Sequence, residues 1–219
     1  MKLGVLFSGG KDSTYAAWLA KQEGHEIVCL ISLISENKES YMFHTPAITM
    51  TQKQAELIGI PLITHITKGE KEKELVDLKN AIKIAVEKYH IQGIVTGALA
   101  SVYQASRIQK LCDSLNLQCI NPLWQKNQIT LLEELIKNKF EVIIVGVFAY
   151  PLDKAWIGRK IDVKYIEDVK KMQEKYKINP AGEGGEFESL VINCPLFKKS
   201  LNFSIKKIIG EKNSWFAEL

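Results

Sequence analysis

The sequence predicts an α/β protein in which a parallel sheet carries helices on both faces and a smaller α+β unit follows. Apolar segments of strand length alternate with amphipathic helical segments through the first two-thirds of the 219 residues. Such alternation is typical of parallel strands joined by right-handed helical crossovers. Beyond Pro122 the pattern changes without any linker-like composition. We therefore expect two tightly packed units, residues 1–125 and 126–219.

The elements of the first unit follow one another in a regular order. Apolar runs predict its strands, at 3–7, 26–33, 62–65, 93–96 and 118–120. Apolar residues at helical spacing predict its helices, at 12–23, 46–58, 75–89 and 101–115. Ligands of such sheets bind beyond the carboxyl ends of the strands. Residues that directly follow the strands are therefore the candidates for a binding site.

The second unit mixes helices with short strands. Helical spacing predicts helices at 129–138 and 165–176, and apolar runs predict strands at 142–148 and 190–193. A Gly/Glu-rich loop, residues 182–189, precedes the last of these strands. The tail from residue 202 to residue 219 is typical of a hairpin, because Gly210 and Asn213 lie near its middle.

The composition argues against several classes of protein. The net charge is only +4 and the lysines are dispersed, which argues against a dedicated nucleic-acid surface. No apolar run approaches the roughly 18 residues that a membrane-spanning helix needs, and the first residues show no signal-peptide pattern. The four cysteines form no C-x-x-C pair and no metal-ligand cluster with a histidine. We expect a cytoplasmic protein with reduced thiols. The sequence leaves open whether the protein forms a homodimer.

The most informative segment is Ser8-Gly9-Gly10-Lys11-Asp12-Ser13, between the first strand and the first helix. Backbone N–H groups and a helix N-terminus meet there, which is typical of an anion site, most naturally for phosphate. The two glycines allow a sharp turn and a close approach to the anion. Lys11 can neutralise phosphate charge, and the Ser8 and Ser13 hydroxyls can donate to phosphate oxygens. The adjacent glycines exclude a Walker A loop.

Asp12 is an unusual residue beside a phosphate, because like charges repel. A Mg²⁺ ion between Asp12 and the phosphates would remove that conflict. Alternatively, the Asp12 carboxylate caps the first helix. The sequence leaves both roles open.

A second group of polar residues lies in the loop after the second strand and should reach the same edge of the sheet. It contains Asn37, Ser40, Tyr41 and His44. His44 taken alone is better explained as a residue at a helix start, because Thr45-Pro46 is a favourable N-terminus.

A third group opens the helix after the fourth strand, where Thr96-Gly97-Ala98 leads to Ser101. Tyr103, Gln104 and Arg107 can share one face of this helix, directed toward the strand ends. Arg107 could clamp a phosphate or a carboxylate with two hydrogen bonds. The spacing alone fits a polar surface helix equally well.

The Gly/Glu-rich loop brings three carboxylates together. Its sequence contains Glu183, Gly184, Gly185, Glu186 and Glu188. The glycines allow close backbone approach and the carboxylates offer hard oxygen atoms, which indicates a possible binding site. Taken alone, such a loop is more often a solvated turn.

These motifs carry a resemblance to a known family. Residues 8–13 resemble the pyrophosphate loop (PP-loop) of ATP pyrophosphatases, which grip the β- and γ-phosphates and break the α–β bond. The chain as a whole resembles the diphthine–ammonia ligase branch of that superfamily, in its short, archaeal-type form. The matching segments are residues 8–13, 36–45, 54–61, 97–107, 122–125, 182–189 and 194–197. The segment 182–189 is the most specific, since generic PP-loop proteins lack it.

The resemblance implies a HUP-type ATP domain followed by a substrate domain. It implies that ATP and Mg²⁺ adenylate the carboxylate of diphthine, a modified histidine on translation elongation factor 2, and that ammonia then displaces AMP. ATP contacts are implied for residues 8–13 together with Gly97 and Ala98, and a metal contact for Asp12. Catalytic roles are implied for Lys11, Asp12, Arg107, Glu183 and Glu186. Substrate contacts are implied for the loop after the second strand, for Ser101, Tyr103 and Gln104, and for the Gly/Glu-rich loop.

Two other functions stay open at this point. One is a different PP-loop adenylating enzyme, either a tRNA-modifying ligase or an amidotransferase for a small carboxylate. The other is a nucleotide-binding sensor without catalytic activity. The absence of paired cysteines and the mild charge weaken the tRNA version.

Overall fold

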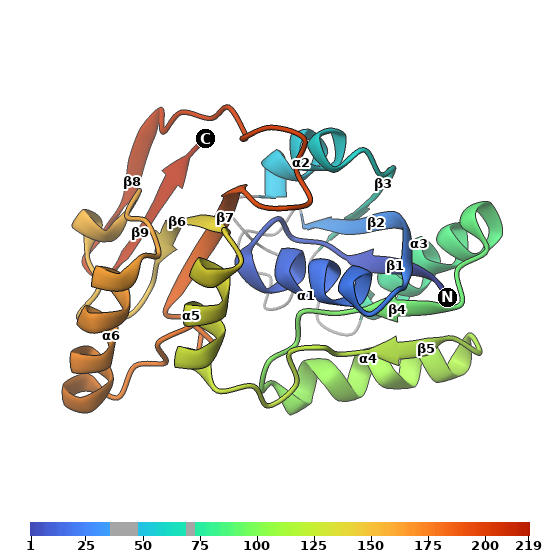
Figure 1. Ribbon diagram of the computed structural model, residues 1–219, viewed down its shortest axis with the longest axis horizontal. Helices are drawn as coiled ribbons and strands as arrows, with labels where there is room; N and C mark the ends of the chain where they lie inside the picture. Colours follow the sequence, from blue (N-terminus) through green and yellow to red (C-terminus); the bar gives the residue numbers. More distant parts are fainter. Residues whose placement is uncertain (36–47, 69–72) are drawn as a thin grey trace.

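The computed structural model describes residues 1–35, 48–68 and 73–219 and contains two sheets side by side (Figure 1). The first sheet has the strand order β3-β2-β1-β4-β5, and each neighbouring pair is parallel. Its strands are β1 (Lys2–Leu6), β2 (Glu26–Ser35), β3 (Leu62–Thr67), β4 (Gly93–Val95) and β5 (Gln118–Ile120). The strand order reverses at β1, where β2 lies on one side and β4 on the other. This arrangement confirms the predicted α/β class.

Helices cover both faces of the parallel sheet because its strands are apolar on both sides. The helices of this part are α1 (Lys11–Gln22), α2 (Thr51–Ile58), α3 (Lys73–Tyr89) and α4 (Val102–Ser114). Along β2, Leu30 joins the core that contains α1, whereas Ile31 and Leu33 join the core that contains α3 and α4. The alternation of a strand's side chains between the two faces of a sheet explains this division.

The second sheet is antiparallel and has the order β7-β6-β9-β8. Its strands are β6 (Glu141–Val147), β7 (Phe187–Asn193), β8 (Lys207–Glu211) and β9 (Ser214–Glu218), and the helices of this part are α5 (Gln128–Lys137) and α6 (Val163–Tyr176). Strands β8 and β9 form a hairpin, which confirms the prediction for the tail. Short 3-10 turns at Ile48–Met50 and Lys154–Trp156 complete the described elements.

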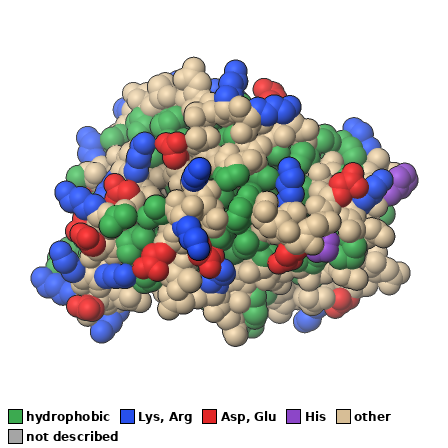
Figure 2. Space-filling model, viewed as in Figure 1, with side chains coloured by type: hydrophobic (Ala, Val, Ile, Leu, Met, Phe, Trp, Pro, Cys, Tyr) green, Lys and Arg blue, Asp and Glu red, His purple; other side chains and the backbone are tan. Residues whose placement is uncertain are grey.

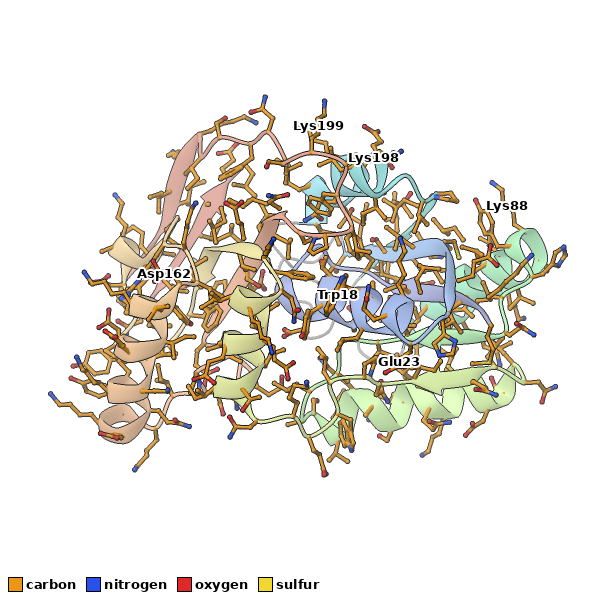
Figure 3. All side chains as sticks on the ribbon, viewed as in Figure 1. Trp18, Glu23, Lys88, Asp162, Lys198 and Lys199 are labelled. Atoms are coloured by element: carbon orange, nitrogen blue, oxygen red, sulfur yellow. The ribbon has the colours of Figure 1, made fainter. Side chains whose placement is uncertain are left out.

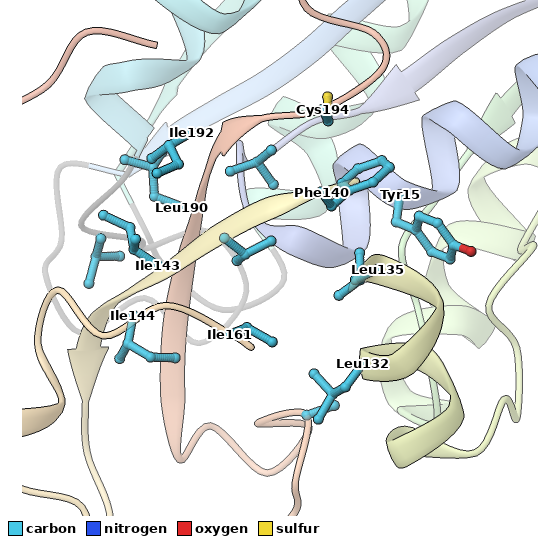
Figure 4. Packing of buried hydrophobic residues seen from close by; sticks show 14 of the residues in the cluster. Tyr15, Leu132, Leu135, Phe140, Ile143, Ile144, Ile161, Leu190, Ile192 and Cys194 are labelled. Atoms are coloured by element: carbon cyan, nitrogen blue, oxygen red, sulfur yellow. The ribbon is translucent and has the colours of Figure 1, made fainter. Parts of the chain in front are cut away.

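One apolar core runs through both sheets. Tyr15 of α1 packs edge-on against Phe140, with ring centroids 5.2 Å apart, and Figure 4 shows both rings beside Leu135 and the strands of the second sheet. The segment after β7 returns to the first unit, where the Lys198 amide donates to the Leu57 carbonyl at 3.0 Å; Figure 3 shows Lys198 beside α2. The expected tight packing is confirmed, while the boundary near residue 125 stays a prediction.

The start of strand β7 differs from the expectation. Strand β7 begins at Phe187, inside the predicted loop, because Phe187 pairs with Val147 and is buried. Glu188 and Ser189 therefore belong to a strand. In the described ranges, no helix is long and apolar enough to cross a membrane. On the face in Figure 2, Lys and Arg are interspersed with Asp and Glu rather than gathered in one patch.

Candidate active site

A cavity of about 230 Å³ opens at the carboxyl ends of β1, β2 and β4, where the sequence predicts ligand binding. Its apolar wall comes from both strands and helices. The residues of this wall are Leu6, Phe7, Ile31, Leu33, Ile48, Leu78, Ala98 and Ile108. The polar side of the cavity is formed by Ser8, Asp12, Ser13, Thr96, Gly97 and Gln104. An apolar wall beside a few polar groups is the usual composition of a small-molecule site.

The glycines of the 8–13 loop are required by its geometry. Gly9 has a φ of +78°, a left-handed conformation that favours glycine. Helix α1 begins directly after Gly10, an N-cap residue that has no side chain to cap the helix. A Cβ on Gly97 would lie 2.7 Å from the Asp12 carbonyl carbon and from the Ser13 nitrogen, so only glycine lets β4 approach α1 so closely. The first N–H groups of a helix lack intrahelical acceptors, so a helix start with glycine at its N-cap suits an anion.

The two serine hydroxyls of the loop lie together on the cavity wall. The oxygens Oγ of Ser8 and Ser13 are 3.1 Å apart, and the Ser8 amide donates to Ser13 Oγ at 3.2 Å. Ser13 Oγ also lies 3.3 Å from the Gly10 carbonyl, to which it can donate. A phosphate oxygen in the cavity could take hydrogen bonds from both hydroxyls after a rotation of their O–H groups.

Lys11 and Asp12 form an ion pair beside the cavity. Lys11 Nζ lies 2.8 Å from Asp12 Oδ2 and 5.2 Å from the centre of the Phe187 ring, and the residue is only 4% exposed. Within the described ranges, the buried oxygen Oδ1 of Asp12 has no hydrogen-bond partner. The capping alternative for Asp12 is wrong, because the N-cap residue of α1 is Gly10 and Asp12 lies inside the helix. The free carboxylate oxygen is instead available to a cation.

Strand β7 of the second sheet is hydrogen-bonded to the 8–13 loop. The Lys11 amide donates to Ser189 Oγ at 3.1 Å, and the Val191 amide donates to the Gly9 carbonyl at 3.1 Å. Gln54 Nε2 donates both to the Gly9 carbonyl at 3.0 Å and to the Val191 carbonyl at 2.8 Å. Strand β7, at the edge of its own sheet, is thus part of the site.

The Gly/Glu-rich loop uses two of its carboxylates to fix its own position. Glu183 Oε1 accepts hydrogen bonds from the amides of Ala100 and Ser101, each at 2.9 Å, which fixes the loop to the start of α4. Burial and the nearby charge of Asp12 raise the pKa of Glu183, although the two amides and Lys11 oppose the shift. The loop therefore lies close to the ion pair of Lys11 and Asp12.

Glu186 lies at the centre of this loop. Its Oε1 accepts from the Asn179 backbone amide at 2.8 Å and from Asn179 Nδ2 at 2.7 Å, and its Oε2 accepts from the Gly184 amide at 2.8 Å. The residue is 7% exposed. Both carboxylate oxygens of Glu186 are thus engaged by the loop itself.

Glu188 carries the third carboxylate, and its environment differs from those of Glu183 and Glu186. It lies on β7 opposite Gly146, and its Oε2 is buried without a hydrogen-bond partner within the described part of the chain. Burial raises the pKa of Glu188 to about 8. A Cβ on Gly146 would lie 2.8 Å from the Phe148 ring and 3.6 Å from Glu188 Cβ. The partly exposed Phe148 ring therefore lies beside Glu188.

Comparison with known families agrees with this geometry. Models of the diphthamide synthase N-terminal domain and of the diphthamide synthase C-terminal domain match residues 1–119 and 127–218. The chain belongs to the diphthamide synthase family. The resemblance predicted from the sequence is thereby confirmed.

Relatives of this family match nearly the whole chain. A protein of Bos taurus named diphthine–ammonia ligase is 33% identical over 99% of this chain and 88% of its own length. The Mus musculus protein of the same name is 35% identical over 92% of this chain and 82% of its own. A solved structure described as a predicted subunit of tRNA methyltransferase, from Methanocaldococcus jannaschii, is 18% identical, with a TM-score of 0.45 over 92% of this chain and 100% of that one. The family models and the relatives favour the diphthamide synthase interpretation over the tRNA and sensor alternatives.

In this diphthamide synthase family member, the structure brings many of the predicted residues together. The predicted residues that line the cavity are Ser8, Asp12, Ser13, Gly97, Ala98 and Gln104. Ser101 caps α4, accepting a hydrogen bond from the Gln104 amide at 3.3 Å. The guanidinium of Arg107 lies 3.5 Å from the centre of the Tyr103 ring, and Arg107 lines a groove between α3 and α4 rather than the cavity. Asn37, Ser40, Tyr41 and His44 lie outside the described residues.

Four residues that support the site were not among the predicted ones: Gln54, Thr96, Asn121 and Ser189. Thr96 Oγ1 donates to Asn121 Oδ1 at 2.7 Å and accepts from the Ala98 amide at 3.0 Å, which fixes the turn that lines the cavity. Gln54 and Ser189 lie inside segments that resemble the diphthamide synthase family, which is the one signal that could have indicated them. Over the described ranges, no group of three or more His, Cys, Asp or Glu side chains could hold a metal on its own.

Proposed function

We propose that this protein amidates the diphthine residue of translation elongation factor 2, using ATP and ammonium and releasing AMP and pyrophosphate. The observation that carries the proposal is the start of α1 behind a two-glycine turn, with Ser8, Asp12 and Ser13 of the same segment lining the cavity. Membership of the diphthamide synthase family supports the choice of substrate. Because the acceptor is a translation factor, we expect the reaction to take place in the cytoplasm.

We expect the cavity and the 8–13 loop to contact different parts of ATP. The apolar wall suits the adenine ring, and the serine hydroxyls with the start of α1 suit the phosphates. We expect Lys11 to turn its ammonium from Asp12 toward the outer phosphates, because an unshielded polyphosphate is the stronger attraction. This assignment agrees with the role that the PP-loop resemblance implies for residues 8–13.

The donor set at Asp12 fits Mg²⁺. This ion prefers oxygen ligands and is commonly held by one or two protein carboxylates together with substrate phosphates. Oδ1 of Asp12 is buried and lacks a hydrogen-bond partner in the described part of the chain, so it is the atom we expect to contact the ion. Bound there, Mg²⁺ would neutralise charge that develops on the phosphates.

The reaction needs an activated acyl group, because a carboxylate has no good leaving group. An oxygen of the diphthine carboxylate attacks the α-phosphorus of ATP, the α–β bond breaks, and pyrophosphate leaves with the electron pair. Ammonia then attacks the acyl carbon, the bond to AMP breaks, and the added nitrogen loses a proton. Lys11 and the amides at the start of α1 stabilise the departing negative charge, and the cavity holds the reactants in contact.

The acidic loop is suited to a cationic substrate. Diphthine carries a quaternary ammonium group, and ammonium is a cation as well. The family resemblance implies catalytic roles for Glu183 and Glu186, but backbone amides already occupy carboxylate oxygens of both residues. Oε2 of Glu188 has no hydrogen-bond partner within the described ranges, and Glu188 pairs with Gly146, against which the Phe148 ring packs. Burial favours the protonated form of Glu188, and a quaternary ammonium group bound beside it would favour the ionised carboxylate instead. With an aromatic ring on the same side, Glu188 is the better candidate.

Reconstitution tests the proposed reaction. Elongation factor 2 that carries diphthine is incubated with the protein, ATP, Mg²⁺ and ¹⁵N-ammonium, and the modified peptide is analysed by mass spectrometry. We expect ¹⁵N in a new amide at the diphthine carboxyl and AMP as the nucleotide product. Unmodified diphthine, with an equally pure protein that binds ATP, would contradict the choice of substrate. A mixture of tRNAs in place of the factor tests the alternative acceptor.

A further inference from the structure

Gln54 is a polar side chain buried against the 8–13 loop, and the reaction described above leaves it without a role. It lies on α2, outside the cavity, and is 0% exposed. Its Nε2 donates to two carbonyl groups, that of Gly9 in the 8–13 loop and that of Val191 on β7. A buried amide with two such bonds is a candidate for fixing the geometry of the loop.

The bond to Gly9 controls more than the Gly9 carbonyl. That carbonyl accepts from Gln54 at 3.0 Å and from the Val191 amide at 3.1 Å, so its direction is fixed from two sides. The Gly9 carbonyl and the Gly10 N–H belong to one planar, trans peptide unit, and they point in opposite directions. Fixing the carbonyl toward Gln54 and β7 therefore turns the Gly10 N–H away from them, to the side of the loop left for a phosphate.

Neighbouring amides of the loop are already engaged. The Ser8 amide donates to Ser13 Oγ and the Lys11 amide donates to Ser189 Oγ. Because these two amides are engaged, phosphate binding depends more on the amide of Gly10, which is the N-cap residue of α1. A glycine loop with a freely rotating peptide at this point would present that donor only part of the time.

The oxygen Oε1 of the Gln54 amide has a different environment from Nε2. Its Oε1 has no hydrogen-bond partner in the described ranges, and it would lie 2.2 Å from a Cβ on Gly9. A buried unpartnered oxygen is unfavourable, so Gln54 stabilises the fold less than a fully hydrogen-bonded amide would. Reversing the amide would place Oε1 against two carbonyl oxygens, which excludes the alternative orientation.

We propose that Gln54 is a positioning residue for phosphate binding, and that it acts by orienting the Gly9–Gly10 peptide. The proposal rests on the proposed function in one respect, the binding of ATP phosphates by the 8–13 loop. It assigns to Gln54 an effect on ATP affinity that its contribution to packing would not produce.

The test compares Gln54→Met with Gln52→Met. Methionine preserves the length of the side chain and removes both donors. Gln52 is an exposed residue of the same helix whose Nε2 donates to Glu56, so Gln52→Met controls for the substitution itself. ATP affinity is measured by titration calorimetry and the melting temperature by circular dichroism. We expect Gln54→Met to weaken ATP binding about tenfold, because one donor to a charged oxygen is misdirected, and Gln52→Met to leave it unchanged.

Each outcome decides between the two proposals. If the wild type binds no ATP, the proposed function fails. If the wild type binds ATP and the folded Gln54→Met variant binds it equally well, Gln54 has only a packing role and this inference is wrong. If Gln54→Met does not fold, the wild type labelled with ¹⁵N is titrated with inorganic pyrophosphate. The Gly10 amide resonance should then shift strongly, and a Gly10 resonance that does not move would overturn the inference.

Discussion

Replacing Glu188 with glutamine should make the protein more resistant to alkaline conditions. Burial raises the pKa of Glu188 to about 8, from an ordinary value of 4.5. In the unfolded chain the carboxyl loses its proton near its ordinary pKa, whereas in the folded chain it keeps the proton up to about pH 8. The folded state therefore binds more protons in this window, and stability falls as the pH rises through it. Glutamine cannot ionise and should remove this loss.

The size of the effect follows from the shift. One unit of pKa corresponds to about 1.4 kcal/mol, so the share of the loss that falls between pH 6 and pH 9 is about 2.5 kcal/mol. Water reaches part of the half-buried side chain and reduces the effect to about 2 kcal/mol. In a protein of this size, that difference corresponds to roughly 4 to 8 °C in the melting temperature.

Melting curves of the wild type and Glu188→Gln between pH 6 and pH 9 measure this difference. The gap between the two melting temperatures should widen with pH in favour of the variant. Glu141→Gln is the matched control, since hydrogen bonds from Asn193 and Lys160 lower the pKa of Glu141. Glu141 is ionised throughout the range, so the difference in melting temperature between Glu141→Gln and the wild type should stay constant. Parallel curves for wild type and Glu188→Gln would refute the assignment of a buried, protonated carboxyl.

The remaining predictions concern the site and its support. Lys11→Ala should weaken ATP binding by at least tenfold, because a charged contact to phosphate is lost, and calorimetry with unchanged affinity would count against the role of Lys11. Gly97→Ala should destabilise the protein by about 1 to 3 kcal/mol, because a Cβ would lie 2.7 Å from α1 backbone atoms; urea unfolding measures this, and an unaltered midpoint would contradict the close approach. Glu186→Gln should cost about 1 to 3 kcal/mol, since a donor NH₂ would face amides that now donate to the carboxylate. Glu188→Gln should lower amidation of diphthine with ATP affinity preserved, and equal amidation rates would remove Glu188 from substrate recognition.

The arrangement of strands and helices could be predicted from the sequence because its signals are local. Periodic apolar residues fix the element type within a few turns of the chain, and alternation of strands and helices fixes a parallel sheet. The 8–13 loop could be predicted for the same reason, since its glycines, cation and hydroxyls are contiguous. The start of β7 at Phe187 could not, because its pairing with Val147 depends on a strand 40 residues away in the chain.

The supporting residues of the site could not be predicted from local patterns. Gln54 and Ser189 reach the 8–13 loop from sequence separations of 45 and 178 residues. Nothing beside Gln54 in the chain indicates that its amide meets two carbonyl groups. The roles of the acidic residues likewise depend on packing. Glu186 accepts hydrogen bonds from its own loop, whereas Oε2 of Glu188, two residues later on a strand, has no partner among the residues that the structure describes.

The central claim is that an oxygen of the substrate carboxylate becomes bonded to the α-phosphorus of ATP in the site beside the 8–13 loop. Elongation factor 2 with an ¹⁸O-labelled diphthine carboxylate tests it most directly, in the complete reaction with ATP, Mg²⁺ and ammonium. We predict that the label appears in the phosphate of AMP, in an amount equal to the amide formed. Label in inorganic phosphate accompanied by ADP, or amide formed with unlabelled AMP, would contradict the account.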